Sequence, residues 1–213
     1  GVQTCALPIF LMLAVTAAPL LPQQRGLPED KAWLDRKVQQ WNKSGASIPH
    51  AKRSPAIFDE IPSVCKTEQR AAKTTEERAL AAAGWMLFAT SDNRSGSNIP
   101  RPATLEDPHI VLVGGMANMD GMCRPDMYQY FVFVDGVYAG TLSPRLMDSR
   151  SDESAVAIRF PVPGKIAADF TRYSEKDPMC CPSRMTELTF EIAREKGKAV
   201  VSWIAAKTRP SDY

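Results

Sequence analysis

The sequence predicts an α+β domain in which two N-terminal helices precede a curved antiparallel β-sheet of about five to seven strands. Apolar residues near the start recur at helical spacing, whereas apolar and polar residues alternate through much of the second half, as they do in strands. Between two of the alternating runs stands Asp135-Gly136, a dipeptide typical of a two-residue hairpin turn. One face of the sheet is expected to pack against the helices.

The first predicted helix spans residues 28–42, where Pro28 suits the first turn. Four apolar side chains then share one face: Trp33, Leu34, Val38 and Trp41. The second helix is expected to begin at Thr74, because Thr74 and Glu77 have the spacing of a capping box. Gly84 is expected to end it, since a glycine commonly follows a helix C-terminus.

Strands are predicted from residue 85 onward, beginning with 85–90 and 109–115. The hairpin around Asp135-Gly136 follows, and later strands are expected at 155–162, 166–173, 185–193 and 199–207. Alternation in the first strand of the hairpin assigns its side chains to opposite faces. One face is predicted to hold Tyr128, Tyr130, Val132 and Val134, and the other Gln129, Phe131 and Phe133.

The N-terminus predicts export. Residues 1–9, GVQTCALPI, are what a common short-read sequencing adapter encodes in frame, so we treat them as an artefact and leave Cys5 out of the cysteine count. Residues 10–24 resemble the end of a signal peptide, with small residues placed for cleavage near Ala17. Residues 25–213 are then predicted to form a single exported domain, soluble in the periplasm or the medium.

Charge and cysteine content limit the classes of function. The net charge of +2 is spread evenly, which argues against a nucleic-acid surface, and no remaining apolar run could span a membrane. Four cysteines remain in the predicted mature chain: Cys65, Cys123, Cys180 and Cys181. An even count in an exported protein predicts two disulfides, while the spacing does not suit zinc. Adjacent side chains can point in different directions, so Cys65 and Cys123 are each predicted to pair with one of Cys180 and Cys181, in either combination.

Three stretches of the sequence resemble catalytic or metal-binding patterns. Ser63 to Lys66, Ser91-Asp92-Asn93 and Lys207-Thr208 match fragments of the penicillin-recognising serine hydrolase motifs, but the final glycine is Arg209 and Cys65 interrupts the first motif. A methionine-rich loop offers soft ligands for Cu(I), although packing of these side chains in the interior is the preferred interpretation. Its candidate ligands are Met116, Met119, Met122, Cys123 and Met127. The acidic stretch 147–153 lacks the glycine and final glutamate of a calcium loop and is read as a solvated turn.

Several short motifs carry a family resemblance. They are Cys123-Arg124-Pro125, the Tyr-Phe-Val strand, Gly140 to Pro144, and Asp177-Pro178-Met179-Cys180-Cys181-Pro182-Ser183. With these motifs, about residues 80–205 resemble the LppP/LprE lipoprotein family of bacterial exported proteins. The resemblance implies an α+β envelope protein and brings no activity, cofactor or catalytic residue with it. Because no lipobox cysteine follows the apolar run, lipid anchoring is not expected.

The sequence therefore predicts a non-catalytic cell-envelope domain, without a cofactor, that binds an unknown envelope ligand or protein. Within the segments that carry the resemblance, the candidate ligand-binding residues are Arg124, Asp126, Tyr128 and Asp177. The alternative is a Cu(I)-binding protein that uses the loop 116–127, and a serine hydrolase is the third hypothesis.

Overall fold

The computed structural model describes residues 33–35, 40–52, 65, 70–95 and 103–212. All of these residues fall within one unit of the chain, residues 32–213. The predicted adapter artefact (1–9) and signal peptide (10–24) lie outside the described residues, so their assignment stays a prediction.

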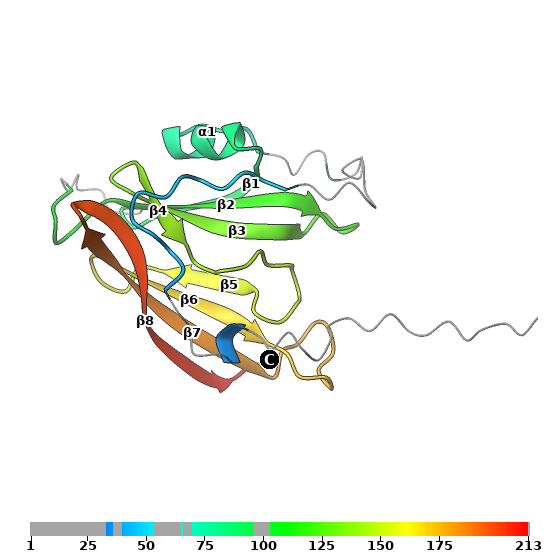
Figure 1. Ribbon diagram of the computed structural model, residues 1–213. Coiled ribbons are helices and arrows are strands. Elements are labelled where there is room, and N and C mark those ends of the chain that lie inside the picture. Colours follow the sequence, from blue (N-terminus) through cyan, green and yellow to red (C-terminus); the bar gives the residue numbers. More distant parts are fainter. Residues whose placement is uncertain (1–32, 36–39, 53–64, 66–69, 96–102, 213) are drawn as a thin grey trace, which may run out of the picture. The chain divides into compact units, whose positions relative to one another are not determined.

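The described fold is mostly β, with one short α-helix and two four-stranded antiparallel sheets (Figure 1). A three-residue 3₁₀ helix, η1, comes first at Trp33–Asp35, and α1 spans Thr75–Ala82. Sheet A contains, in spatial order, β1 (Met86–Asp92), β2 (Ile110–Met119), β3 (Pro125–Val134) and β4 (Val137–Thr141). Sheet B contains β5 (Ala155–Arg159), β6 (Lys165–Arg172), β7 (Arg184–Glu195) and β8 (Lys198–Pro210).

The predicted first helix is wrong. In the described part of 28–42, only Trp33–Asp35 is helical, and Gln40 to Asn42 have no regular structure. The two tryptophans that suggested an amphipathic helix instead pack into the interior. Trp33 makes an edge contact with Phe170, and Trp41 makes one with Phe190, at centroid distances of 5.6 and 6.1 Å. Tertiary packing of large aromatic side chains thus outweighs helical spacing here.

The prediction of one curved sheet is also wrong, although every predicted strand segment overlaps an observed strand. The chain leaves sheet A after β4 and starts a separate sheet with β5. Alternation identifies a strand and its buried face, but it carries no information about which strand is its neighbour. The number and pairing of the sheets therefore could not be read from the pattern.

Helix α1 forms as the sequence predicts. The Thr74 hydroxyl accepts a hydrogen bond from the Glu77 amide, and the Glu77 carboxylate accepts one from the Thr74 amide, each at 3.2 Å. These two bonds satisfy amides that have no partner within the helix. Gly84 follows the helix end with a φ of +88°, a conformation that favours glycine. The capping prediction at both ends is confirmed.

The predicted hairpin is also confirmed, as the turn that joins β3 and β4. Asp135 and Gly136 both have positive φ, 51° and 79°, as a type I′ turn requires. The predicted assignment of β3 side chains to two faces holds: alternate residues from Tyr128 to Val134 pack in one cluster, while Phe131 and Phe133 pack in another.

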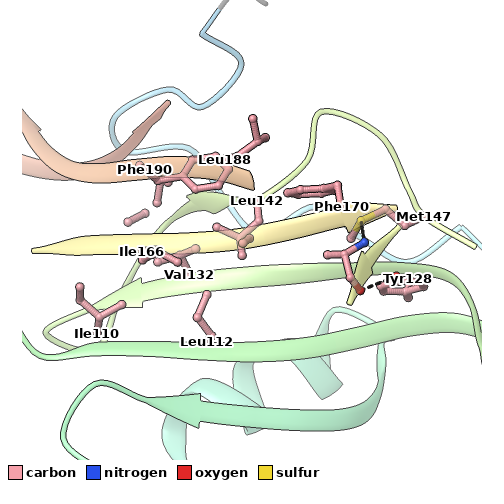
Figure 2. Packing of buried hydrophobic residues seen from close by; sticks show 14 of the residues in the cluster. Ile110, Leu112, Tyr128, Val132, Leu142, Met147, Ile166, Phe170, Leu188 and Phe190 are labelled. Atoms are coloured by element: carbon pink, nitrogen blue, oxygen red, sulfur yellow. Dashed lines mark hydrogen bonds between the residues drawn. The ribbon is translucent and has the colours of Figure 1, made fainter. Parts of the chain in front are cut away.

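Both faces of sheet A are covered. Its inner face and that of sheet B share one hydrophobic cluster, part of which is drawn in Figure 2. The labelled members include Leu112 and Val132 from sheet A, and Ile166, Phe170, Leu188 and Phe190 from sheet B. On its other face, sheet A packs under α1 through a second cluster that includes Leu80, Trp85, Val113 and Phe131. The layers are thus α1, sheet A and sheet B.

Candidate functional site

Arg124 organises a turn instead of facing an open site. Its guanidinium bonds to the Asp120 carboxylate, which also accepts the backbone amides of Met122 and Arg124 at 2.8 and 2.9 Å. Burial alone would raise the pKa of Asp120, but the hydrogen bonds from Arg124 and Met122 hold it below its usual value. This turn carries Cys123, so Arg124 helps to position a disulfide.

Tyr128 connects the two sheets. Its side chain is buried, and its hydroxyl donates a 3.1 Å hydrogen bond to the carbonyl of Ala155 at the start of β5. Burial raises the pKa of this hydroxyl. The backbone of Tyr128 also exchanges two 2.8 Å hydrogen bonds with Met147, which holds the segment between the sheets. Tyr128 therefore contributes to the interior and presents no group to a ligand.

Asp126 lies beside another carboxyl group, that of Asp148. Burial and the proximity of Asp148 together raise the pKa of Asp126 to about 6. The Asn118 amide is 3.4 Å from Asp126, and Asp148 accepts the amide of Met127 at 2.9 Å. At neutral pH these two carboxyls form a small region of repulsive negative charge at the start of β3.

Asp177 braces the loop that contains Cys180-Cys181. Its carboxylate accepts hydrogen bonds from the amide and hydroxyl of Ser174, at 2.8 and 2.7 Å, and from the amide of Ser183 at 2.8 Å. These bonds hold the pKa of Asp177 below its usual value. The four candidate ligand-binding residues thus each make bonds to their own neighbours, and their role in ligand binding stays a prediction.

The structure does not bring the methionines of the loop together. Met116 and Met119 are buried in the cluster shared by the two sheets, whereas Met127 packs against the cluster under α1. The side chain of Met122 is exposed, and Cys123 is bonded to Cys65. These sulfurs therefore point into different environments, as expected for side chains that fill space in a core.

The predicted disulfide pairing is wrong. Cys65 is bonded to Cys123 with a Cα–Cα distance of 5.1 Å, and Cys180 is bonded to Cys181. The turn at Asp120 places Cys123 beside the buried Cys65, so neither cysteine reaches the 174–183 loop. The prediction assumed that adjacent cysteines point apart, an assumption that this loop does not meet.

The hydrolase fragments lie partly outside the described residues, which include neither Ser63 nor Lys66. Asp92 ends β1 and binds His109, while Asn93, which follows it, binds the backbone of Pro108 and Ile110. Thr208 lies on β8, and its hydroxyl bonds to Thr186. The second and third fragments thus belong to different sheets and have separate structural partners.

A pocket of about 300 Å³, which the sequence did not suggest, opens beside β3 and β4; we call it the 141–146 pocket. The buried rings of Trp85 and Phe131 lie at its base. The remaining lining residues come from two segments and β3: Pro49, His50, Lys52, Gln129, Thr141, Ser143, Pro144, Arg145 and Leu146. Six of these are exposed and form its walls: Pro49, His50, Lys52, Pro144, Arg145 and Leu146.

Hydrogen bonds from the base of the 141–146 pocket hold both walls. The Gln129 amide donates to the carbonyls of Ser143 and Arg145 at 2.9 and 3.0 Å. In the wall formed by residues 49–52, the Trp85 indole donates to the carbonyl of Pro49 at 2.7 Å, and the Ala51 amide donates to the carbonyl of Ala83 at 2.9 Å. The pocket is therefore built into the fold by buried donors and does not depend on a ligand to form.

The 141–146 pocket has basic residues in its lining. They are His50, Lys52 and Arg145, and no Asp or Glu is among the lining residues that the structure describes. A second pocket, of about 160 Å³, shares Arg145 and Leu146 but is lined by Asp148, Asp152 and Glu153. The segment that carries Arg145 thus separates a basic pocket from an acidic one. The sequence signal nearest to the 141–146 pocket is Gly140 to Pro144, one of the motifs that carry the family resemblance.

The comparison with protein families covers β2 to most of β7 and includes the wall from Thr141 to Leu146. Residues 107–194 match the family model described as LppP/LprE lipoprotein. The resemblance predicted from the motifs is confirmed, although the match to the LppP/LprE model is shorter than the predicted 80–205. No curated protein and no solved structure matches the chain.

The match of residues 107–194 to a lipoprotein family model agrees with the predicted export. Among the described residues, no helix is both long and apolar enough to cross a membrane.

Proposed function

We propose that this protein is a non-catalytic binding domain of the bacterial envelope, and that its 141–146 pocket takes the end of a small amphipathic molecule with an anionic group. The observation that carries the proposal is the combination of apolar walls over an aromatic base with basic residues, and with no Asp or Glu among the described lining residues. Ligand sites in proteins commonly combine an apolar lining with a few placed polar groups in this way.

The apolar walls would supply most of the affinity. Pro49, Pro144 and Leu146 are exposed around the opening, and covering apolar surface contributes about 25 cal/mol per Å² removed from water. At about 300 Å³, the pocket is at the small end of ligand sites. It therefore suits one short chain or ring of a ligand.

The basic residues would supply the preference for charge. Lys52 is exposed, so it would contribute modestly to an ion pair and the contribution would fall with added salt. The second pocket, on the other side of Arg145 and Leu146, is acidic and would itself disfavour an anion. We therefore expect selectivity for an anionic headgroup over a cationic one.

The test uses three eight-carbon probes that differ only in their headgroups: octanoate, octanol and octylamine. Isothermal titration of the protein should give the tightest binding with octanoate and the weakest with octylamine. Lys52→Glu should weaken octanoate binding about three- to tenfold. Lys207→Glu, which makes the same charge change at an exposed site on β8, should leave it unchanged.

A second variant separates the apolar contribution from the ionic one. Leu146→Ser should weaken octanoate and octanol by similar factors, because it removes apolar wall without changing the charge. Equal affinity for all three probes, or equal effects of Lys52→Glu and Lys207→Glu, would contradict the proposed site.

A further inference from the structure

The two disulfides occupy opposite environments. Cys65 is fully buried in the cluster between the sheets, and its bond to Cys123 joins residues 58 positions apart. Cys180 is exposed and Cys181 is half-buried, and their bond joins neighbours in the chain. A disulfide stabilises a fold mainly by restricting the unfolded chain, and this effect grows with the length of the closed loop. The Cys180–Cys181 bond can therefore add little to the stability of the fold.

The loop around Cys180-Cys181 also has its own support. Asp177 accepts three hydrogen bonds from Ser174 and Ser183, as described above. The amide of Cys181 donates to the carbonyl of Pro178 at 2.9 Å, and the Tyr173 hydroxyl donates to the carbonyl of Met179 at 3.1 Å. None of these bonds involves a sulfur atom. The loop should therefore keep its shape when the disulfide opens.

We infer that Cys180–Cys181 is a thiol–disulfide exchange site, which passes between a disulfide and a dithiol while the domain stays folded. This inference is independent of the 141–146 pocket. An exposed disulfide in a preformed loop is accessible to an external thiolate, whereas a buried one is reached only when the protein opens. The partner is a dithiol, either a small molecule or the paired cysteines of a reductase.

The exchange balances as a two-electron transfer. A thiolate of the external dithiol attacks Sγ of Cys180, the more exposed of the two residues. A mixed disulfide forms, the Cys180–Cys181 bond breaks, and the Cys181 thiolate takes a proton from water. The second thiolate of the reductant then attacks the reductant's first sulfur, which is bonded to Cys180 in the mixed disulfide. This releases the Cys180 thiolate, which is protonated in turn. The protein gains two thiols, and the external dithiol becomes a disulfide.

The experiment titrates the folded, oxidised protein with dithiothreitol, blocks new thiols with iodoacetamide and maps them in tryptic peptides. The peptide 177–184 holds both adjacent cysteines, because it is bounded by Lys176 and Arg184. We expect it to gain two labels at a dithiothreitol concentration at least about tenfold lower than the one that labels Cys65 and Cys123. The melting temperature should be the same before and after this first labelling step.

A matched pair of double variants provides the control. Cys180→Ser with Cys181→Ser should leave the melting temperature unchanged, whereas Cys65→Ser with Cys123→Ser should lower it. Simultaneous labelling of all four cysteines, failure of 177–184 to react before the protein unfolds, or equal loss of stability in the two double variants would overturn the inference.

Discussion

Sheet A and sheet B have similar strand connections but different surroundings. Sheet A is covered on one face by α1 and on the other by sheet B, and almost all of β2 is buried. Sheet B is apolar on one face only, since Arg159, Asp169 and Glu187 alternate with residues of the shared cluster. The 141–146 pocket opens at sheet A, with Trp85 and Phe131 of the helix-side cluster at its base. A face that is otherwise buried thus supplies the apolar part of the candidate site.

The largest difference between the sheets should appear when a matched valine is shortened in each. Val113 on β2 is completely buried, while Val156 on β5 is 53% exposed. Val113→Ala should reduce the free energy of unfolding by about 2–4 kcal/mol through lost burial and a cavity. Val156→Ala should change it by less than about 0.5 kcal/mol. Urea unfolding measures both, and similar losses would show that the two sheets are not covered differently.

The next effect concerns Glu77, which links α1 to β1. Burial alone would raise its pKa, but hydrogen bonds from the Lys73 amide, Thr90 and Arg70, with one from the Thr74 amide, lower it to about 2. Because the folded-state pKa lies below the ordinary value of 4.5, this stabilisation is complete above about pH 4.5 and is lost as the pH falls towards 2.

Glu77→Gln should therefore cost about 2–3 kcal/mol at pH 7 and much less at pH 2. Unfolding measured across this pH range tests the prediction. The half-buried neighbour Glu76 provides the control, and Glu76→Gln should change stability by less than about 0.5 kcal/mol. A loss that does not depend on pH would mean that the Glu77 carboxylate is not the stabilising group.

Asp126 should show a smaller pH effect of the opposite sign. Its pKa of about 6 lies above the ordinary 3.8, so the folded protein loses stability as the pH rises from about 4 to 6. Asp126→Asn removes one of the two adjacent carboxylates and should raise the free energy of unfolding by about 1–2 kcal/mol at pH 7. At pH 3 this gain should disappear. A variant that is less stable than the original protein at pH 7 would contradict the repulsion between Asp126 and Asp148.

The smallest effect is expected on the charged face of sheet B. Arg159 donates to Asp169 at 2.8 Å and also pairs with Glu187, but 43% of its side chain is exposed. Arg209 also lies 3.8 Å from the Asp169 carboxylate, so Asp169 keeps a positively charged neighbour when Arg159 is replaced. Arg159→Ala should therefore reduce stability by less than about 1 kcal/mol, and 1 M salt should shrink the difference further. A loss of unfolding free energy as large as that of Val113→Ala would show that this face contributes to stability as strongly as the core does.

Local features of the fold could be predicted from the sequence, while its assembly could not. The Thr74 capping box and the Asp135-Gly136 turn depend on residues close in the chain, and both appear as expected. The sequence 28–42 has helical spacing, yet the ring contacts of Trp33 and Trp41 with sheet B decide its conformation. Such contacts join residues more than a hundred positions apart, and no local pattern encodes them.

The candidate site shows the same limit. Conspicuous residue types suggested Asp126, Tyr128 and Asp177, but each of these is engaged by its own neighbours. The 141–146 pocket combines residues from around position 50 with others from positions 85 to 146, none of them unusual by themselves. The sequence signal nearest to this region is the Gly140 to Pro144 motif, which carries part of the family resemblance. Concave sites built from ordinary residues need the three-dimensional arrangement to become visible.

The amides of Gln40 and Asn42 have a consequence for association between molecules. Gln40 bonds to the carbonyl of Val201 and the amide of Trp203, while Asn42 bonds to both backbone groups of Thr141 and to Val201. These side chains occupy positions that a backbone neighbour would otherwise take along β4 and β8. An unpaired strand edge is a template for another chain. Because the two amides occupy hydrogen-bonding groups at these edges, they hinder the addition of a strand from a second molecule, as in a fibril. Because a carboxamide does not titrate, they do so equally in acidic and neutral surroundings.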